Sequence, residues 1–120
     1  MADSSDLSFP RWTLDVLTEP VTDGVARVTA TGEIDLANAD QLRRALAPLV
    51  ADPAVRLLVC DLSSVSFLAC SGLTVLLDVQ EELVARGARL RLVAASPAVL
   101  RPILLTGLSD LLPVDVHLTG

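Results

Sequence analysis

The spacing of hydrophobic residues predicts two strands near the start of the chain. Over residues 25–32 every second residue is apolar, which is typical of a strand that is buried on one face. A shorter segment over residues 12–17 predicts another strand. The Asp23-Gly24 pair between them favours a tight turn, so we expect these two strands to pair antiparallel.

Beyond residue 35 the apolar positions recur with helical spacing and predict three helices. The first covers residues 42–50, with Asn38 or Asp35 as a candidate cap. The second follows Ser71-Gly72 and stops at Gly87, and the third opens at Pro97 and stops at Thr106-Gly107.

Three further strands alternate with these helices. Residues 57–62 form an almost unbroken apolar run, which predicts a central strand, and a loop over residues 63–69 is expected to follow it. Shorter strands are expected over residues 90–95 and 114–118. The order β-β-α-β-α-β-α-β predicts an α/β domain, with a mixed β-sheet of about five strands and three main helices.

The domain is expected to span residues 11–120, preceded by a flexible N-terminal arm over residues 1–10. The chain has 120 residues and 52% of them are hydrophobic, which excludes disorder for most of its length. Trp12 and Phe67 are interpreted as core anchors, and the single histidine, His117, as a surface residue near the end of the chain.

Composition excludes several classes of function. A net charge of −6 and an aromatic content of 2% argue against nucleic-acid binding. All basic residues are arginine, so neither a P-loop lysine nor a Schiff-base lysine is available. Cys60 and Cys70 match no zinc pattern and are too few for a disulfide scaffold, so we expect no metal and no cofactor.

The N-terminal sequence is acidic and lacks the features of a signal peptide. No apolar stretch approaches the roughly 18 residues that a membrane span requires. We therefore expect a soluble, cytoplasmic protein that does not insert into the membrane.

Two loops are expected to meet at the carboxyl edge of the sheet, where α/β proteins usually bind their ligands and partners. One follows the second strand over residues 32–38, and the other follows the third strand over residues 63–71. The latter leads into a helix N-terminus, where unpaired N–H groups favour negative charge.

Four motifs, taken in order, resemble the STAS domain of bacterial anti-sigma factor antagonists. Along the chain they are Gly32-Glu33-Ile34-Asp35 ahead of the first helix, Val59-Cys60-Asp61-Leu62-Ser63, residues 65–73, and Leu105-Thr106-Gly107-Leu108 at the end of the third helix. The resemblance covers residues 12–118.

The resemblance implies a protein-binding regulator without catalysis of its own. Members of this family bind an anti-sigma factor, often one with serine-kinase activity, and so free a sigma factor for transcription. The kinase phosphorylates a serine at the start of the second helix, which dissociates the complex, and a phosphatase reverses the modification. A dianionic phosphate in a packed interface adds repulsion and desolvation cost.

The chain departs from the family pattern at the phospho-acceptor. Where the family has Asp-Ser-Ser/Thr-Gly, this chain has Ala69-Cys70-Ser71-Gly72, so a thiol occupies the acceptor position. Ser71 could serve as a substitute acceptor, the protein could be a permanently active antagonist, or Cys70 could be a redox switch.

The resemblance places the partner-binding surface on two segments, and the expected contact residues are Glu33, Asp35, Asn38, Leu68, Ser71, Gly72 and Leu73. Each position also has a purely structural interpretation. Cys70 could be a buried, inert residue, Ser71 an N-cap, Asp35 a cap of the first helix and Glu33 a solvated charge. Structural loop roles are expected for Asp61, Gly32 and Gly107.

Two other functions remain open at this stage. The first is an accessory STAS subunit of a membrane transport system, which would use the same fold. The second is a thiol enzyme with Cys70 as nucleophile, which is disfavoured because its base would have to be His117 on the last strand.

Overall fold

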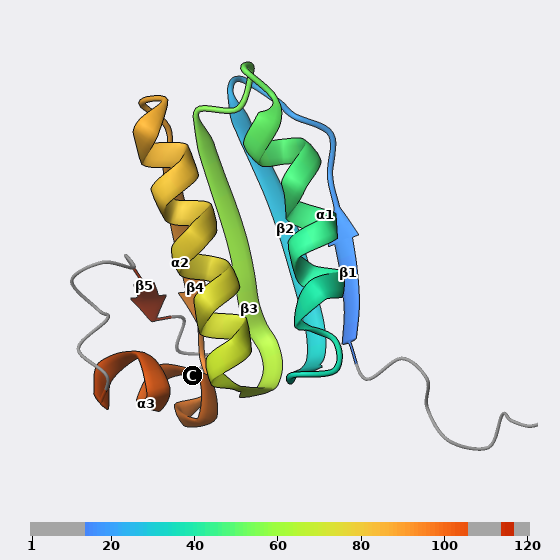
Figure 1. Cartoon of the computed structure of the whole chain (residues 1–120), viewed down its shortest axis with the longest axis vertical. Coiled ribbons are helices and arrows are strands. Elements are labelled where there is room, and N and C mark those ends of the chain that lie inside the picture. Colours follow the sequence, from blue (N-terminus) through green and yellow to red (C-terminus); the bar gives the residue numbers. More distant parts are fainter. Residues whose placement is uncertain (1–13, 106–113, 117–120) are drawn as a thin grey trace, which may run out of the picture.

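The computed structural model of the chain describes residues 14–105 and 114–116. The elements are β1 (Leu14–Thr18), β2 (Val25–Ile34), α1 (Ala39–Ala51), β3 (Leu57–Leu68), α2 (Cys70–Ala85), β4 (Arg89–Ala94), α3 (Pro97–Leu105) and β5 (Val114–Val116). They form a five-stranded mixed sheet in the order β1-β2-β3-β4-β5 (Figure 1). The predicted order of elements and the α/β fold class are confirmed.

The Asp23-Gly24 turn joins β1 and β2 as predicted. Both residues have positive φ angles, 53° and 79°, as a two-residue hairpin turn requires. Thr22 and Val25 exchange two backbone hydrogen bonds of 3.0 and 2.9 Å across it. β1 therefore lies antiparallel to β2, whereas the pairs β2–β3, β3–β4 and β4–β5 are parallel.

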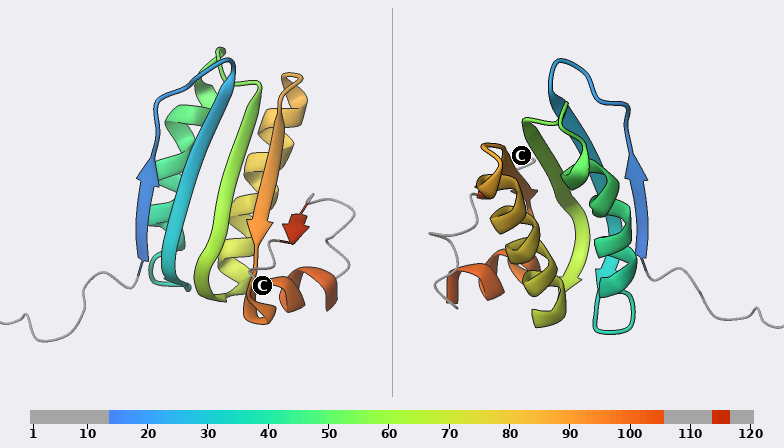
Figure 2. Two further views of the ribbon diagram at one scale, coloured as in Figure 1. Left: turned by 180° about the vertical axis from the view of Figure 1, so that it is seen from behind. Right: turned by 45° about the horizontal axis from the view of Figure 1, so that its top comes forward.

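The helices α1 and α2 lie side by side over one face of the sheet, and their apolar faces close the core (Figures 1 and 2). The alternating residues Ala26, Val28 and Ala30 are fully buried, which confirms the predicted inner face of β2. β3 is the central strand, as its apolar run predicted. Viewed from behind, the strands lie in front of these helices, and α3 lies where β3 and β4 end (Figure 2).

The predicted loop over residues 63–69 is wrong, because β3 continues as a strand to Leu68. Its pairing with β2 shifts register between Thr29 and Thr31 and again between Gly32 and Glu33. Each shift places one extra residue in β3, which is a β-bulge. The buried positions of β3 are therefore spaced by three beyond Leu62, and the period-two signal of a strand is lost.

Gly32, predicted as a loop residue, lies inside β2 next to these irregularities. Its φ of 113° belongs to the region that favours glycine, so the residue type follows from the strand distortion. Several predicted features fall outside the described residues. They are the N-terminal arm, Trp12, His117 and residues 106–108 of the Leu105-Thr106-Gly107-Leu108 motif, which include the predicted helix stop at Gly107.

No helix in the described ranges is both long enough and apolar enough to cross a membrane.

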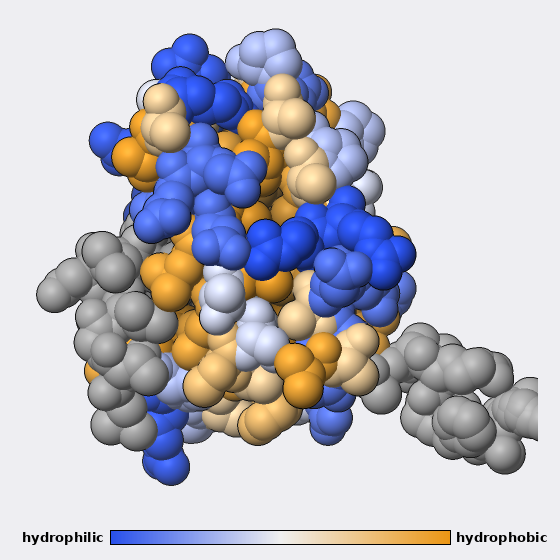
Figure 3. All heavy atoms as spheres, viewed as in Figure 1, coloured by the Kyte–Doolittle hydropathy of each residue, from blue (hydrophilic) through white to orange (hydrophobic). Residues whose placement is uncertain are grey.

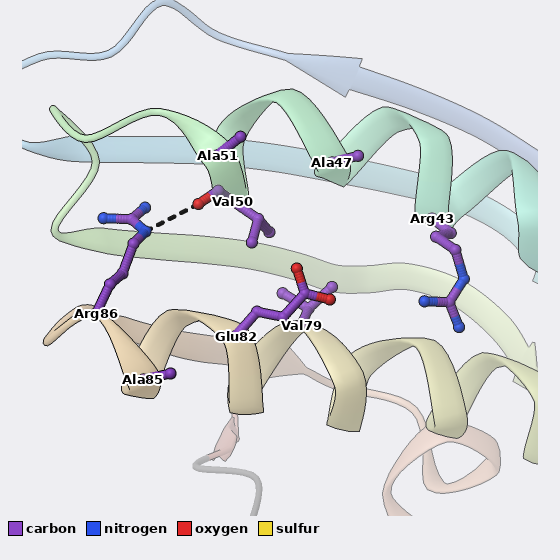
Figure 4. Close-up of a pocket in the computed structure, with 8 residues that line it drawn as sticks. All are labelled: Arg43, Ala47, Val50, Ala51, Val79, Glu82, Ala85 and Arg86. Atoms are coloured by element: carbon purple, nitrogen blue, oxygen red, sulfur yellow. Dashed lines mark hydrogen bonds between the residues drawn. The ribbon is translucent and has the colours of Figure 1, made fainter.

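Arg86 joins the C-terminal ends of the two long helices. Its Nε donates a hydrogen bond of 2.8 Å to the carbonyl of Val50 in α1 (Figure 4). Its Nη1 donates another of 2.8 Å to the carbonyl of Val55. The bond to Val50 gives a partner to a backbone carbonyl in the last turn of α1, where carbonyl groups have no partner within the helix. Beside it, a groove of about 370 Å³ runs between α1 and α2, and Arg43 lines its far part.

We expect Arg86→Ala to lower the free energy of unfolding by about 2 kcal/mol, because it removes the charged donor from the carbonyl groups of Leu49, Val50 and Val55. Arg44→Ala is the matched control, since among the described residues Arg44 pairs with Asp40 alone, on the exposed side of α1. That control is expected to cost less than about 0.5 kcal/mol. Urea denaturation measures both values, and equal losses for the two variants would contradict the assigned role of Arg86.

Candidate functional site

The structure brings together the two segments that the sequence predicted to share a surface. Glu33 pairs with Phe67 and Ile34 with Leu68 at the ends of β2 and β3. One step further, the Ala69 N–H donates a 2.9 Å hydrogen bond to the carbonyl of Ile34. The turn that follows β2 is thus held directly beside the start of α2.

The turn between β2 and α1 is closed by two side chains that bond to each other's backbone. The Asp35 N–H donates to Asn38 Oδ1 at 2.8 Å, and the Asn38 N–H donates to Asp35 Oδ1 at 3.0 Å. Asn38 Nδ2 also donates to the carbonyl of Glu33 at 2.8 Å. Asn38 occupies the N-cap position of α1, one of the two candidates predicted, but its side chain makes no capping hydrogen bond and, together with that of Asp35, closes the turn.

α2 begins at Cys70, three residues before the predicted start after Ser71-Gly72, and its N-cap is Ala69, whose side chain cannot accept a hydrogen bond. Ser71 is therefore not the predicted N-cap. Cys70, the first residue of the helix, is exposed, so its interpretation as a buried residue is wrong. The Oγ of Ser71 is buried and has no hydrogen-bond partner within the part of the chain that the structure describes, so an enzyme could not reach it in this conformation.

The expected contact residues divide into an exposed and a buried group. Glu33 is exposed, and Asp35 and Ser71 are partly exposed. The side chains that lie in the interior are those of Asn38, Leu68 and Leu73, together with Gly72. These four residues lie beneath the surface, and their direct contact with a partner stays a prediction.

Gly72 shows how closely α2 approaches the strands. A Cβ atom at this position would lie 2.6 Å from Ile34 Cγ2 and 2.7 Å from Leu68 Cδ1, well inside van der Waals contact. Both neighbours are buried side chains with little room to move. Only glycine lets the first turn of α2 lie this close to β2 and β3.

Two exposed apolar residues at this site escaped the sequence analysis. Phe67 was predicted as a core anchor, but the bulges in β3 turn it outward and leave it 47% exposed. Leu36 is 83% exposed in the turn before α1, and its only sequence signal is an apolar side chain within a polar turn. Apolar side chains gather at the lower end of the molecule, where β2 and β3 finish and α2 begins (Figure 3).

Cys60 and Asp61 have structural environments within β3. Cys60 is a free thiol with no exposed surface, and its burial, with a smaller contribution from Asp61, raises its pKa to about 12. The Ser63 N–H donates to Asp61 Oδ1 at 2.9 Å. Asp61 is thus bonded locally, as expected, although it lies in a strand and not in a loop. Among the described residues no group of His, Cys, Asp and Glu could hold a metal ion.

Comparison with known proteins gives consistent matches. Residues 17–119 match the STAS domain family. The chain is 38% identical over 96 residues to the anti-sigma-F factor antagonist RsfB of Mycobacterium tuberculosis, covering 78% of this chain and 77% of that protein.

Two solved structures resemble it closely. An anti-sigma factor antagonist from Mycobacterium paratuberculosis has 40% sequence identity and a TM-score of 0.76, with 84% of each chain covered. The Bacillus antagonist SpoIIAA in its unphosphorylated form has 25% identity and a TM-score of 0.72, with 84% of this chain and 88% of that chain covered.

The two cysteines should differ sharply in reactivity. A thiol reagent at pH 8 is expected to modify Cys70 in the native protein and to reach Cys60 only after unfolding, because Cys60 is buried and stays protonated. Mass spectrometry should show one label per chain before denaturation and two afterwards. Cys70→Ala should carry none in the native state, and rapid native labelling of Cys60 would contradict the structure.

Proposed function

The chain belongs to the STAS domain family, and on that premise we propose that it is an anti-sigma factor antagonist. It binds an anti-sigma factor in the cytoplasm and thereby releases a sigma factor for transcription. The observation that carries this proposal is the surface formed where the turn at residues 35–38 lies beside the start of α2. The relatives at 38% and 40% identity, which are antagonists, support it.

The surface has the properties of a protein-binding site. Its backbone is fixed by the Ala69–Ile34 hydrogen bond and by the reciprocal bonds between Asp35 and Asn38. A preorganised surface loses little conformational entropy when it binds. The alternative of an accessory transport subunit rests on the shared fold alone, and no feature of this surface favours it.

Control by phosphorylation is altered in this chain. Cys70 stands at the position of the family's acceptor serine, and the neighbouring Ser71 hydroxyl is buried. A serine kinase that reaches the start of α2 would meet an exposed thiol and no accessible hydroxyl from Ser71. We therefore infer that the antagonist stays in its binding-competent form when a kinase of this type is active.

Charge reversal tests the binding surface. Glu33→Arg should weaken the complex with the anti-sigma factor by at least about tenfold, because it reverses an exposed charge beside Phe67. Glu33 is preferred to Asp35, since Asp35→Arg would also remove the hydrogen bond that closes the turn. Isothermal titration calorimetry with the purified anti-sigma factor measures the Kd.

The control for this experiment is Glu81→Arg, which makes the same charge change at an exposed position in the second half of α2. It should leave the Kd within about twofold of wild type. Unchanged binding by Glu33→Arg would place the partner elsewhere, and equal weakening by both variants would show only a dependence on net charge.

Phosphorylation is tested by supplying the acceptor. Incubated with a serine-kinase anti-sigma factor and ATP, the wild-type protein should incorporate little phosphate, whereas Cys70→Ser should approach one phosphate per chain. Cys70→Ala is the matched control and should stay unlabelled. Intact mass measures incorporation, and stoichiometric modification of Ser71 in the wild type would refute the inference.

A further inference from the structure

Five large hydrophobic side chains are exposed among the described residues: Leu17, Leu36, Phe67, Val84 and Leu104. Leu36 and Phe67 differ from Leu17 and Val84 because they lie on the two segments that form the proposed surface. Exposed single apolar residues are common on proteins, so exposure alone assigns no role. Leu36 and Phe67 lie on adjacent segments whose backbone is held by hydrogen bonds, which makes these two residues the candidates for contact with a partner.

Each of the two side chains is held outward by its own backbone. Leu36 lies inside the turn that Asp35 and Asn38 close from both ends, with bonds of 2.8 and 3.0 Å. Phe67 follows the second bulge of β3 and pairs with the exposed residue Glu33, while its neighbour Leu68 is buried. Neither side chain can turn into the core without breaking this local structure.

The charges beside these two residues favour one kind of partner. Glu33 pairs across the strands with Phe67, and Asp35 immediately precedes Leu36, so a carboxylate accompanies each apolar side chain. A partner surface that covers both must accommodate apolar groups at its centre and acidic groups next to them. An apolar pocket with basic side chains at its rim meets both requirements.

We propose that Leu36 and Phe67 are the two hydrophobic anchors of the complex, and that they enter an apolar pocket with a basic rim on the anti-sigma factor. This inference rests on the proposed function and names the residues that supply most of the affinity. In protein interfaces a few buried apolar residues, aromatic ones prominent among them, dominate the binding energy, and the surrounding charges mainly determine association rate and specificity.

The test compares truncations at matched exposed positions. Leu36→Ala and Phe67→Ala should each raise the Kd for the purified anti-sigma factor by at least about tenfold. The control variants Leu17→Ala and Val84→Ala remove exposed apolar side chains, 62% and 55% exposed, from β1 and from the far half of α2. These controls should change the Kd by less than about twofold.

Two readouts separate loss of binding from loss of structure. Thermal unfolding should give all four variants a Tm close to that of wild type. Phe67→Leu, which keeps an apolar side chain at the anchor, should recover most of the affinity that Phe67→Ala loses. If Phe67→Leu binds the anti-sigma factor as weakly as Phe67→Ala does, the proposal that the partner recognises an apolar side chain at this position is overturned.

The outcomes distinguish this inference from the proposed function. Equal affinity for wild type, Leu36→Ala and Phe67→Ala would overturn the anchor assignment and leave the antagonist function intact. Failure of the wild-type protein to bind any of the anti-sigma factors encoded with it would overturn both. Selective loss of binding by the two anchor variants supports both.

Discussion

The site depends on the parallel pairing of β2 with β3, which continues beyond the rest of the sheet. β4 pairs with β3 only as far as Asp61, whereas β2 pairs with it up to Leu68. The hydrogen bond from the Ala69 N–H to Ile34 then joins the two crossover connections. The turn before α1 follows β2, and the start of α2 follows β3. Without this extension the two segments would have no common support.

This arrangement separates residues that build the surface from residues that are available to a partner. Gly72 allows α2 to approach Ile34 and Leu68 closely, and these groups are buried beneath the surface. Cys70 remains exposed above them, one position from a serine whose hydroxyl is buried. On the proposed function, the residue at the first position of α2 determines what a kinase can modify, and this position is separate from the buried residues that support the surface.

Local patterns in the sequence were sufficient to predict the fold. The alternation in β2 and the Asp23-Gly24 turn specified the hairpin, and the apolar run at residues 57–62 specified the central strand. The bulges in β3 could not be predicted, because a strand with extra residues loses its period and serines at positions 63, 64 and 66 are typical of a loop. The outward direction of Phe67 depends on those bulges, so it escaped prediction too.

The central claim is that an anti-sigma factor covers the joined ends of β2 and β3 together with the start of α2. Hydrogen–deuterium exchange of the free and bound protein tests it most directly, because it reports on every backbone amide without any substitution. Slower exchange confined to residues 33–37 and 67–74 in the complex is the expected result. Protection of the groove between α1 and α2 or of the helix-free face of the sheet, with no change in those two segments, would contradict it.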